Sequence, residues 1–298
     1  MRLSTLASGS VRAWAYPARA YRFTRRWPVI PSAVVLLLVV MAIFAPLLAP
    51  HDPLRADLSK RLGAPAWMED GTPDYYLGGD ALGRDLLSRT IFGARISLMV
   101  AGTVLFVGGI FGTSLGLISG YAGGIWDEVL MRFADMALAI PFIVIALVAS
   151  VVFGASLGLV IVLLSVTQWP QFSRQVRAET LQLKTNDYVA AARVAGASPI
   201  RVILKHILPG LQNTVVVIAT LRVGLLILTE SILSFLGIGI PEPTPAWGAM
   251  VADGRPYIST AWWVALVPGG AIFLTVFGFN FLGDWFRDYT DPRLRQLN

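Results

Sequence analysis

Two charged residues in an otherwise uncharged, apolar stretch are the first candidates for chemistry. Arg222 and Glu230 are the only charged side chains within residues 212–235. A charge inside a membrane-spanning helix is costly and usually faces a cavity or a partner. At about 1.5 Å per residue the two lie about 12 Å apart along a helix, too far for a direct pair. Two interpretations stay open: each pairs with a neighbouring helix or reaches an interface, or both line a polar pathway.

Familiar catalytic patterns are missing. The sequence has no Gly-x-x-x-x-Gly-Lys-Ser/Thr phosphate loop, no cysteine, and two histidines, His51 and His206. ATP binding through such a loop, thiol chemistry and a His/Cys/Glu metal cluster are therefore not expected. The sequence predicts a chain that is not an enzyme and that holds no cofactor or metal of its own.

The longest polar interruption in the last two-thirds of the chain, residues 174–210, has dense helix punctuation. Asn186 or Asp187 can cap a helix start, because a short side-chain oxygen accepts from free backbone N–H groups. The alanines that follow favour helix, and Gly196 can end it in the left-handed conformation. Small side chains let another backbone approach closely, so this pattern favours a short helix that docks onto a partner.

A second, basic helix is predicted directly afterwards. Ser198 followed by Pro199 is a cap with proline at the first helical position, and we expect this helix to stop near Pro209. An ordinary solvated loop between two spans stays an alternative interpretation of the whole stretch. A DNA-binding helix-turn-helix fits poorly, because apolar runs on both sides hold the stretch at a bilayer.

The elements that position these residues are membrane helices. Hydrophobic residues make up 55% of the 298 residues and charged residues 14%, against roughly 25% charged in soluble domains. Mean hydropathy is +0.66, and runs of about 20 residues, enough to cross a bilayer, recur. The sequence predicts an all-α polytopic membrane protein with six transmembrane helices, at residues 29–49, 96–118, 136 to about 153, about 157 to 169, 212–235 and 263–283.

Charge sets the predicted orientation. Of the 24 lysine and arginine residues, 16 fall in the N-terminal tail 1–28, the short turn with Arg132, the polar loop 171–210 and the tail 284–298. An excess of these residues marks the cytoplasmic side, so both termini and the loop are predicted to be cytoplasmic. Residues 50–95, with an amphipathic helix, are then external, and residues 96–283 form a core of five transmembrane helices.

Glycine recurs every fourth residue at Gly108, Gly112, Gly116 and Gly120. On a helix these positions form one smooth stripe, which predicts tight packing of a neighbouring helix. We expect the helix to break within residues 120–124, and the charged residues between 127 and 132 to mark a short turn on the cytoplasmic side.

Motifs along the chain resemble those of ABC importer permeases. Ala191-Ala192, Gly196 and Leu208-Pro209 have the spacing of the "EAA" loop of that family, with Ala190 and His206 in place of its usual glutamate and isoleucine. The wider pattern is similar to the "C"-type subunits of the dipeptide/oligopeptide/nickel subfamily and covers nearly the whole chain from residue 29. The matching stretches are residues 82–85, 93–97, 187–189, 233–237, 243–248, 280–284, 287–288 and 291–292.

The resemblance implies a type I ABC importer permease fold and an assembly at a bacterial or archaeal cytoplasmic membrane. The expected partners are a homologous "B"-type permease, two cytoplasmic ATPases that bind ATP and Mg, and an external substrate-binding protein, with no nucleic acid. The helix at residues 187–195 would be a coupling helix seated in an ATPase groove. The coupling residues are Asp187, Tyr188, Ala191, Ala192, Gly196, Ser198 and Pro199.

The resemblance also implies contacts with the binding protein at the external face. These would be made by Asp80, Arg84, Asp85, Pro243 and Trp247, although packing between the external loops explains the same residues equally well. The expected cargo is a di- or oligopeptide; nickel or another small solute stays an alternative. A self-contained secondary carrier would show paired repeats, and the sequence shows a single docking loop instead.

Overall fold

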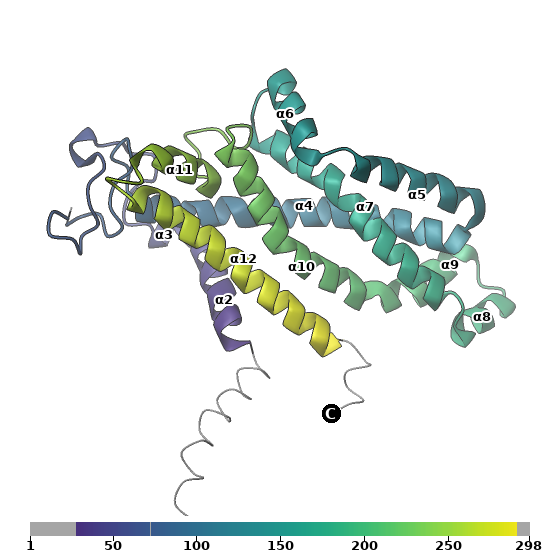
Figure 1. The fold of residues 1–298 in the computed structure, drawn as a ribbon. Helices are drawn as coiled ribbons and strands as arrows, with labels where there is room; N and C mark the ends of the chain where they lie inside the picture. The colour runs from purple at the N-terminus through teal and green to yellow at the C-terminus, as the bar shows by residue number, and fades with distance from the viewer. Residues whose placement is uncertain (1–27, 72, 291–298) are drawn as a thin grey trace, which may run out of the picture.

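The computed structural model describes residues 28–71 and 73–290, and these form helices and loops with no strand (Figure 1). The helix α4 (Leu86–Ala122) has 37 residues and runs the length of the molecule. The loops at residues 49–85 and 236–262 lie at one end of it, which we call the loop end. Residues 123–127 and 184–200 lie at the other, the α8 end, named after α8 (Asp187–Val194).

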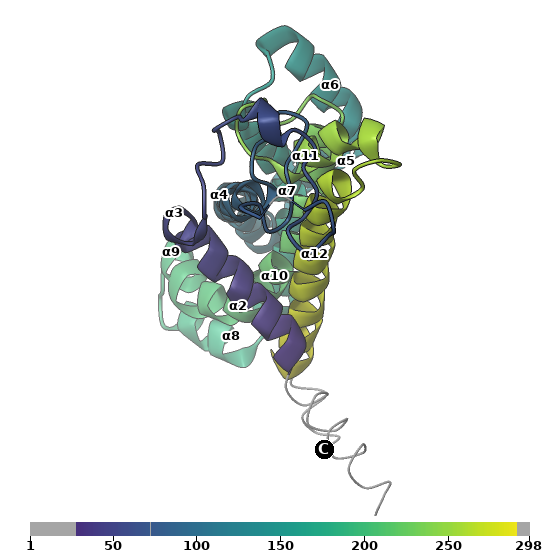
Figure 2. The ribbon, with the colours of Figure 1, turned by 90° about the vertical axis from the view of Figure 1, so that its left-hand side faces the viewer.

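The other long helices pack around α4. The helices α7 (Leu157–Leu183) and α10 (Leu208–Phe235) lie against it, and α12 (Trp263–Thr290) packs on α10. Seen from the loop end in Figure 2, α2 (Val29–Ile43) lies beside α12. The shorter elements are α3 (Ala45–Leu48), a 3-10 turn at Leu58–Lys60, α9 (Pro199–Val202), α11 (Trp247–Gly254) and a 3-10 turn at Arg255–Tyr257.

The all-α prediction is confirmed for the described residues, and the count of membrane crossings is partly supported. Three helices are long and apolar enough to cross a bilayer: α4, the continuous stretch Pro199–Phe235, and α12. A bent pair, α5 (Gly124–Ala139) and α6 (Phe142–Phe153), makes a fourth candidate. Six crossings therefore stay a prediction. The charged tail residues 1–27 and the motif at residues 291–292 lie outside the described residues.

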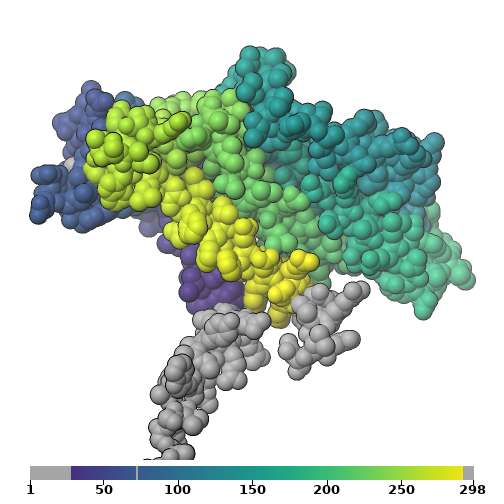
Figure 3. Space-filling view, in the orientation of Figure 1, coloured from purple at the N-terminus to yellow at the C-terminus, as the bar shows by residue number. Residues whose placement is uncertain are grey.

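The predicted break within residues 120–124 is confirmed, but the predicted turn at residues 127–132 is wrong. The helix α4 continues to Ala122 and α5 begins at Gly124, with Gly123 alone between them at φ +66°. The charged residues at 127, 128 and 132 are therefore helical. A second break, which was not predicted, comes at Ile140-Pro141, where α5 and α6 are bent by 77°. A residue before proline is pushed out of the helical region, and Ile140 is extended at ψ 126°. In Figure 3, α6 stands out from the body.

Two further boundaries differ from the prediction. The amphipathic helix expected within residues 50–95 is the beginning of α4, which starts at Leu86 and runs on into the span without a break. The predicted coupling loop, residues 171–210, is largely helical, because α7 extends to Leu183.

The second helix of the coupling loop does not stop near Pro209. It starts at Pro199 as predicted, passes through a π turn at Ile203–Ile207 and continues as α10 to Phe235. Proline in a first helical turn loses no hydrogen bond that it would otherwise have made. Because Pro209 follows the π turn directly, the chain can bend there without ending the helix.

The glycine stripe of α4 packs against α7, as predicted. A methyl group at Gly112 would lie 2.4 Å from the Trp169 carbonyl oxygen, and one at Gly116 would lie 2.5 Å from that of Ser173. Gly112 and Gly116 also frame a Gly-x-Ser-x-Gly spacing around Ser114, a pattern found in some hydrolases. Ser114 lies mid-helix and donates to the Ile110 carbonyl, so the sharp strand-to-helix turn that such a nucleophile needs is not formed here.

Candidate functional site

The helix α8 has well-formed ends. Its N-cap is Asn186, one of the two predicted candidates, with extended backbone; the predicted side-chain capping bond is not formed. At the other end, Gly196 has φ +81°. Its N–H donates to the Arg193 carbonyl, and the Ala197 N–H donates to that of Ala192. This pattern is the Schellman motif, which satisfies free carbonyls at a helix end. Gly196 therefore ends α8 as the sequence predicts.

One side chain anchors α8 to the rest of the protein. Val189 is fully buried, in a small apolar cluster separate from the main core. The other buried members come from α4, α7, α9, the π turn and α10: Leu117, Val176, Val202, Ile207 and Leu211. A fully buried valine stabilises by about 1.5–3 kcal/mol. The helix is thus fixed through one face and stands free on the other.

The predicted coupling residues lie on that free side. Ala192 is half-buried, and the other six are exposed: Asp187, Tyr188, Ala191, Gly196, Ser198 and Pro199. Tyr188 is 47% exposed and Val194 is 91% exposed. Nothing lies within 4 Å of the position a side chain would take at Gly196. These residues lie on α8 or directly after it, and most of them have small side chains.

Polar contacts brace the elements around α8. The guanidinium of Arg193 lies over the Tyr121 ring at 5.3 Å, and the Lys184 ammonium donates to the Gly120 carbonyl at 2.7 Å. The guanidinium of Arg177 forms two hydrogen bonds to Asp127, at 2.5 and 2.7 Å. These contacts tie the ends of α4, α5 and α7 together, so a displacement of α8 would be transmitted to several helices.

A cluster of ion pairs joins the two loop segments at the loop end. The Arg84 Nε donates to Asp80 at 2.5 Å and its NH2 donates to Glu242 at 2.8 Å. The Arg89 guanidinium lies 3.5 Å from Asp80 and 3.7 Å from Glu242. Asp80, Arg84 and Arg89 are at most 5% exposed, and Glu242 is 45% exposed at its side chain. Residues 158 positions apart are thereby held in contact.

Two carboxylates at this cluster have opposite pKa shifts. Burial raises the pKa of Asp253 to about 6, aided by the negative charge of Glu242 and their shared hydrogen bond. Burial also acts to raise the pKa of Glu242, but the hydrogen bond and charge of Arg84 and the charge of Arg89 lower it overall. At neutral pH, Glu242 therefore keeps its charge for Arg84, and Asp253 sits close to its own titration.

The start of α4 is fixed by Asp85. Its carboxylate accepts from the N–H groups of Leu87 and Ser88 and from the Ser88 hydroxyl, and it lies 3.4 Å from His51 Nδ1. An acidic N-cap satisfies free donors and complements the helix dipole. Nearby, Trp247 is fully buried and donates to the Thr90 carbonyl at 2.9 Å.

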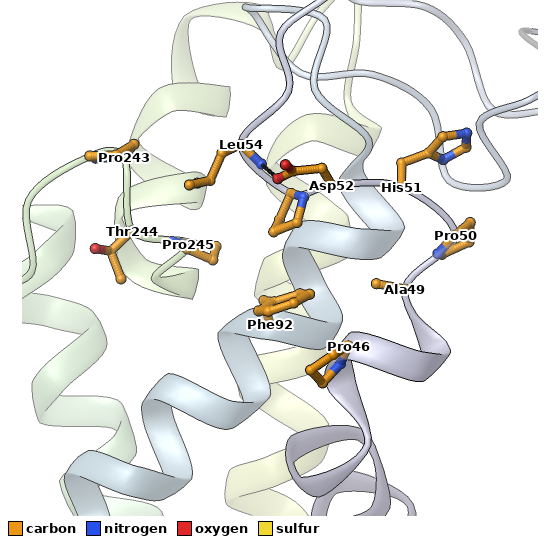
Figure 4. Close-up of a pocket in the computed structure, with 11 residues that line it drawn as sticks. Pro46, Ala49, Pro50, His51, Asp52, Leu54, Phe92, Pro243, Thr244 and Pro245 are labelled. Atoms are coloured by element: carbon orange, nitrogen blue, oxygen red, sulfur yellow. Dashed lines mark hydrogen bonds between the residues drawn. The ribbon is translucent and has the colours of Figure 1, made fainter.

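Four of the five predicted binding-protein contacts are therefore buried within this chain. Asp80, Arg84, Asp85 and Trp247 are at most 5% exposed, and they hold the loops together. Pro243 is exposed. It borders a hollow of about 620 Å³ that residues 243–245 share with the segment after α3 and with Phe92 (Figure 4). Of the five predicted contacts, Pro243 alone is accessible at the surface.

The two charges in α10 have different surroundings. Glu230 is 1% exposed and accepts from Ser97 of α4 at 3.3 Å and from Ser234 at 2.8 Å. Arg222 is half-buried and donates to the Gln171 side chain of α7 at 2.9 Å. Each residue has a partner on a neighbouring helix, as one interpretation predicted, and the two do not pair with each other.

The sequence did not single out three residues that complete these arrangements. Glu242 bridges to Arg84, Asp253 joins Glu242, and Gln171 meets Arg222. The position of Glu242 between Pro241 and Pro243 was visible in the sequence. Its partner was not, because the pairing depends on how α11 folds back onto α4.

Comparison with known families agrees with this architecture. Residues 112–296 match the family described as "Binding-protein-dependent transport system inner membrane component". Residues 22–65 match the "N-terminal TM domain of oligopeptide transport permease C".

Curated relatives match over most of the chain. The glutathione transport system permease protein GsiD of Escherichia coli is 41% identical over 276 residues, 92% of this chain and 89% of the relative. The dipeptide transport system permease protein DppC of Haemophilus influenzae is 39% identical, over 88% of this chain and 89% of the relative. The oligopeptide transport system permease protein OppC of Bacillus subtilis is 38% identical, over 88% of this chain and 84% of the relative.

A solved structure shares the fold. A chain of the inward-facing MetNI methionine ABC transporter aligns with a TM-score of 0.56 at 22% identity, covering 69% of this chain and 98% of that one. At 22% identity this similarity shows a shared arrangement of helices.

Proposed function

The chain belongs to the family of binding-protein-dependent transport system inner membrane components, and we propose that it is the transmembrane permease subunit of an ATP-driven importer of di- or oligopeptides. Relatives named for dipeptide, oligopeptide and glutathione transport support peptides as the cargo. The observation that carries the proposal is α8, a short helix fixed by one buried valine with its other face open.

In this proposal α8 is the coupling helix and lies in the cytoplasm. It seats in a groove of an ATPase, which binds ATP and Mg; this chain hydrolyses no ATP itself. A second ATPase docks beneath a homologous "B"-type permease, and the two permeases enclose the pathway. The exposed alanines allow close approach, and the Schellman end at Gly196 sets the angle between α8 and the helix that follows.

The chain crosses the cytoplasmic membrane of its cell six times, by α2, α4, the α5–α6 pair, α7, α10 and α12. Both termini are cytoplasmic, in keeping with the arginines before residue 28. The loop end then faces outward, and Pro243 and the adjoining hollow receive the substrate-binding protein.

The mechanism follows from two-state coupling. ATP binding closes the ATPase pair and moves both coupling helices, which shifts the permeases between inward- and outward-open states. The contacts of Arg177 with Asp127 and of Lys184 with Gly120 pass the movement of the α8 end to α4, α5 and α7.

Purification from native membranes tests the proposal. A tagged chain in mild detergent should bring a sister permease and one or two phosphate-loop ATPases, with vanadate-sensitive hydrolysis. Reconstituted with its binding protein, the complex should import a radiolabelled dipeptide. Import of nickel in place of peptide would overturn the cargo. A chain that arrives alone and moves solute without ATP would overturn the importer and indicate a secondary carrier.

A further inference from the structure

Arg222 is a charge in the middle of a membrane helix. It lies midway along α10, which has 28 residues, so it is about 21 Å from each end at about 1.5 Å per residue. A cation at that depth in lipid is costly, and such residues face a partner or a water-filled cavity. The residues around Arg222 therefore indicate whether it faces a partner or a water-filled cavity.

The partner that the structure gives Arg222 does not neutralise its charge. The side chain donates through NH2 to the Oε1 of Gln171, a neutral amide, at 2.9 Å. Within residues 28–71 and 73–290, no ion pair includes Arg222. Glu230 is buried against Ser97 and Ser234, so it is not the counter-ion. A guanidinium has five N–H donors, and this one is half-buried, so further donors are open to a ligand.

Neighbouring side chains show that this face is polar. Arg174, one turn along α7 from Gln171, forms an ion pair with Asp135 of α5. Both members of that pair are about half exposed, at 48% and 60% of their side chains. In Figure 1, α7 lies between α5 and α10, and it contacts both. Exposed charges on α5 and α7, beside the half-buried charge of Arg222 on α10, are consistent with a water-lined surface and not with a surface facing lipid tails.

We propose that Arg222, with Gln171 beside it, is a carboxylate-binding site in the translocation pathway, and that it receives the C-terminal carboxylate of a peptide in transit. The inference rests on the proposed function and adds a ligand group and a position. Arginine presents a planar fork of donors that matches a carboxylate. The Gln171 amide can rotate, so that its NH2 group donates to the same carboxylate in place of accepting from Arg222.

The neutral partner is essential to this inference. An acid at residue 171 would occupy the guanidinium permanently, whereas an amide orients it and can be displaced. Exposure of the site to water keeps the interaction modest, because ion pairs in contact with water contribute little. A passing peptide can therefore be held briefly and released.

Two opposite substitutions test the site in the complete importer in liposomes with its binding protein. Arg222→Gln removes the charge, and Gln171→Glu supplies a built-in counter-ion. We expect each to lower the maximal rate of dialanine uptake about tenfold or more, the size of losing one charge-assisted hydrogen bond. Gln171→Ala keeps the charge of Arg222 but loses the amide donor, so it should lower uptake by less than Arg222→Gln does. Stimulation of ATP hydrolysis by the loaded binding protein should persist in all three.

If the contact between Arg222 and Gln171 only held α7 and α10 together, Gln171→Glu should not lower uptake. An ion pair in place of a neutral hydrogen bond would hold the two helices together more firmly. Uptake at the wild-type rate by Gln171→Glu or Arg222→Gln would overturn the site and leave the importer intact. Absence of uptake by the wild-type complex would instead overturn the proposed function.

Direct binding gives a second readout that does not involve the binding protein. The complex in nanodiscs, without that protein, should bind radiolabelled dialanine, and unlabelled dialanine should compete about tenfold better than dialanine amide. In Arg222→Gln the two competitors should become equal. Equal competition in the wild type would show that the carboxylate is not recognised and would overturn the inference.

Discussion

The two ends of the molecule are stabilised in different ways. At the loop end, Arg84 and Arg89 are buried between Asp80 and Glu242 and join segments that are far apart in sequence. At the α8 end, one buried valine attaches a helix whose other face is exposed. Buried charges cannot be separated without a large free-energy cost, so the loop end resists rearrangement. An exposed face of small residues makes no such contacts within the chain and is open to a partner.

This difference indicates a division of roles. Under the proposed function, the loop end would keep the adjoining ends of α4, α10 and α12 in register while the helices move. The α8 end presents a surface and transmits displacement through the contacts of Arg177 and Lys184. We therefore expect substitutions at the loop end to change stability. Substitutions at the α8 end should change the coupling of ATP hydrolysis to peptide import.

The largest effect on stability is expected from Arg84→Ala. It leaves Asp80 buried without its closest partner and removes the bond to Glu242. Removing one member of a buried pair costs about 3–5 kcal/mol, and we expect the lower figure because Arg89 remains near Asp80. The apparent midpoint of thermal unfolding, followed by tryptophan fluorescence in detergent, should fall by several degrees.

Arg132→Ala is the matched control for Arg84→Ala. Arg132 also forms an ion pair four residues along the chain, at 2.5 Å from Glu128, but the two side chains are 73% and 60% exposed. Exposed pairs contribute about 0–1 kcal/mol, so the midpoint should hardly move. Equal shifts for the two variants would show that burial does not distinguish the two ends.

An intermediate effect, on coupling, is expected from Gly196→Leu. The position has φ +81° and nothing within 4 Å, so the folding cost is about 1–2 kcal/mol for a left-handed backbone. A bulky side chain there would keep α8 from seating against an ATPase. We expect the complex to reach the membrane and hydrolyse ATP, with the peptide imported per ATP lowered about tenfold, an interference of roughly 1.4 kcal/mol.

Gly237→Leu is the matched control, because it adds the same backbone strain as Gly196→Leu at a position away from α8. Gly237 follows the end of α10 as Gly196 follows the end of α8, with φ +76° and nothing within 4 Å. It lies at the loop end, so the same substitution should cost similar stability and leave the ratio of peptide to ATP unchanged. Normal uptake by Gly196→Leu, or an equal loss of that ratio in both variants, would exclude α8 as the coupling element.

Local features were predictable from the sequence because they depend on neighbouring residues. The end of α8 at Gly196, the start at Ser198-Pro199 and the stripe from Gly108 to Gly120 each follow from backbone geometry or side-chain size. Pro209 misled the prediction because the preceding π turn accommodates it. Whether a proline ends a helix depends on where the preceding hydrogen bonds are made, which the sequence does not specify.

Contacts between distant segments could not be predicted in the same way. The acids and bases at residues 80–89 were recognised, but their burial depends on Glu242 arriving from the other loop. For that reason four of the five residues assigned to a binding-protein surface are buried within the chain. Arg222 and Glu230 stood out by type alone, while Gln171 was one polar residue among several in α7. The pairing became visible only with the packing of α7 on α10.

The smallest expected effect is on pH dependence, from Asp253→Asn at the loop end. The pKa of Asp253 is raised to about 6, above its ordinary 3.8, by burial and then by Glu242. The folded chain therefore binds this proton more tightly than the unfolded chain does. By linkage, the Asp253 contribution to stability becomes less favourable as pH rises from about 4 to about 6 and stays so above.

Asparagine has no proton to lose and can still donate a hydrogen bond to Glu242, whose own pKa stays low beside Arg84. The variant should unfold at the same temperature as the wild type near pH 4 and at a higher temperature above pH 6. The gain should be about 1–2 kcal/mol, reduced from the full shift by solvent screening at a half-exposed site. Unfolding midpoints of both proteins, measured in detergent from pH 4 to 8, give this difference directly. If the difference between the two unfolding midpoints did not change from pH 4 to 8, Asp253 would titrate at its ordinary pKa. The loop end would then be held by Arg84 and Arg89 without a carboxyl poised near neutrality.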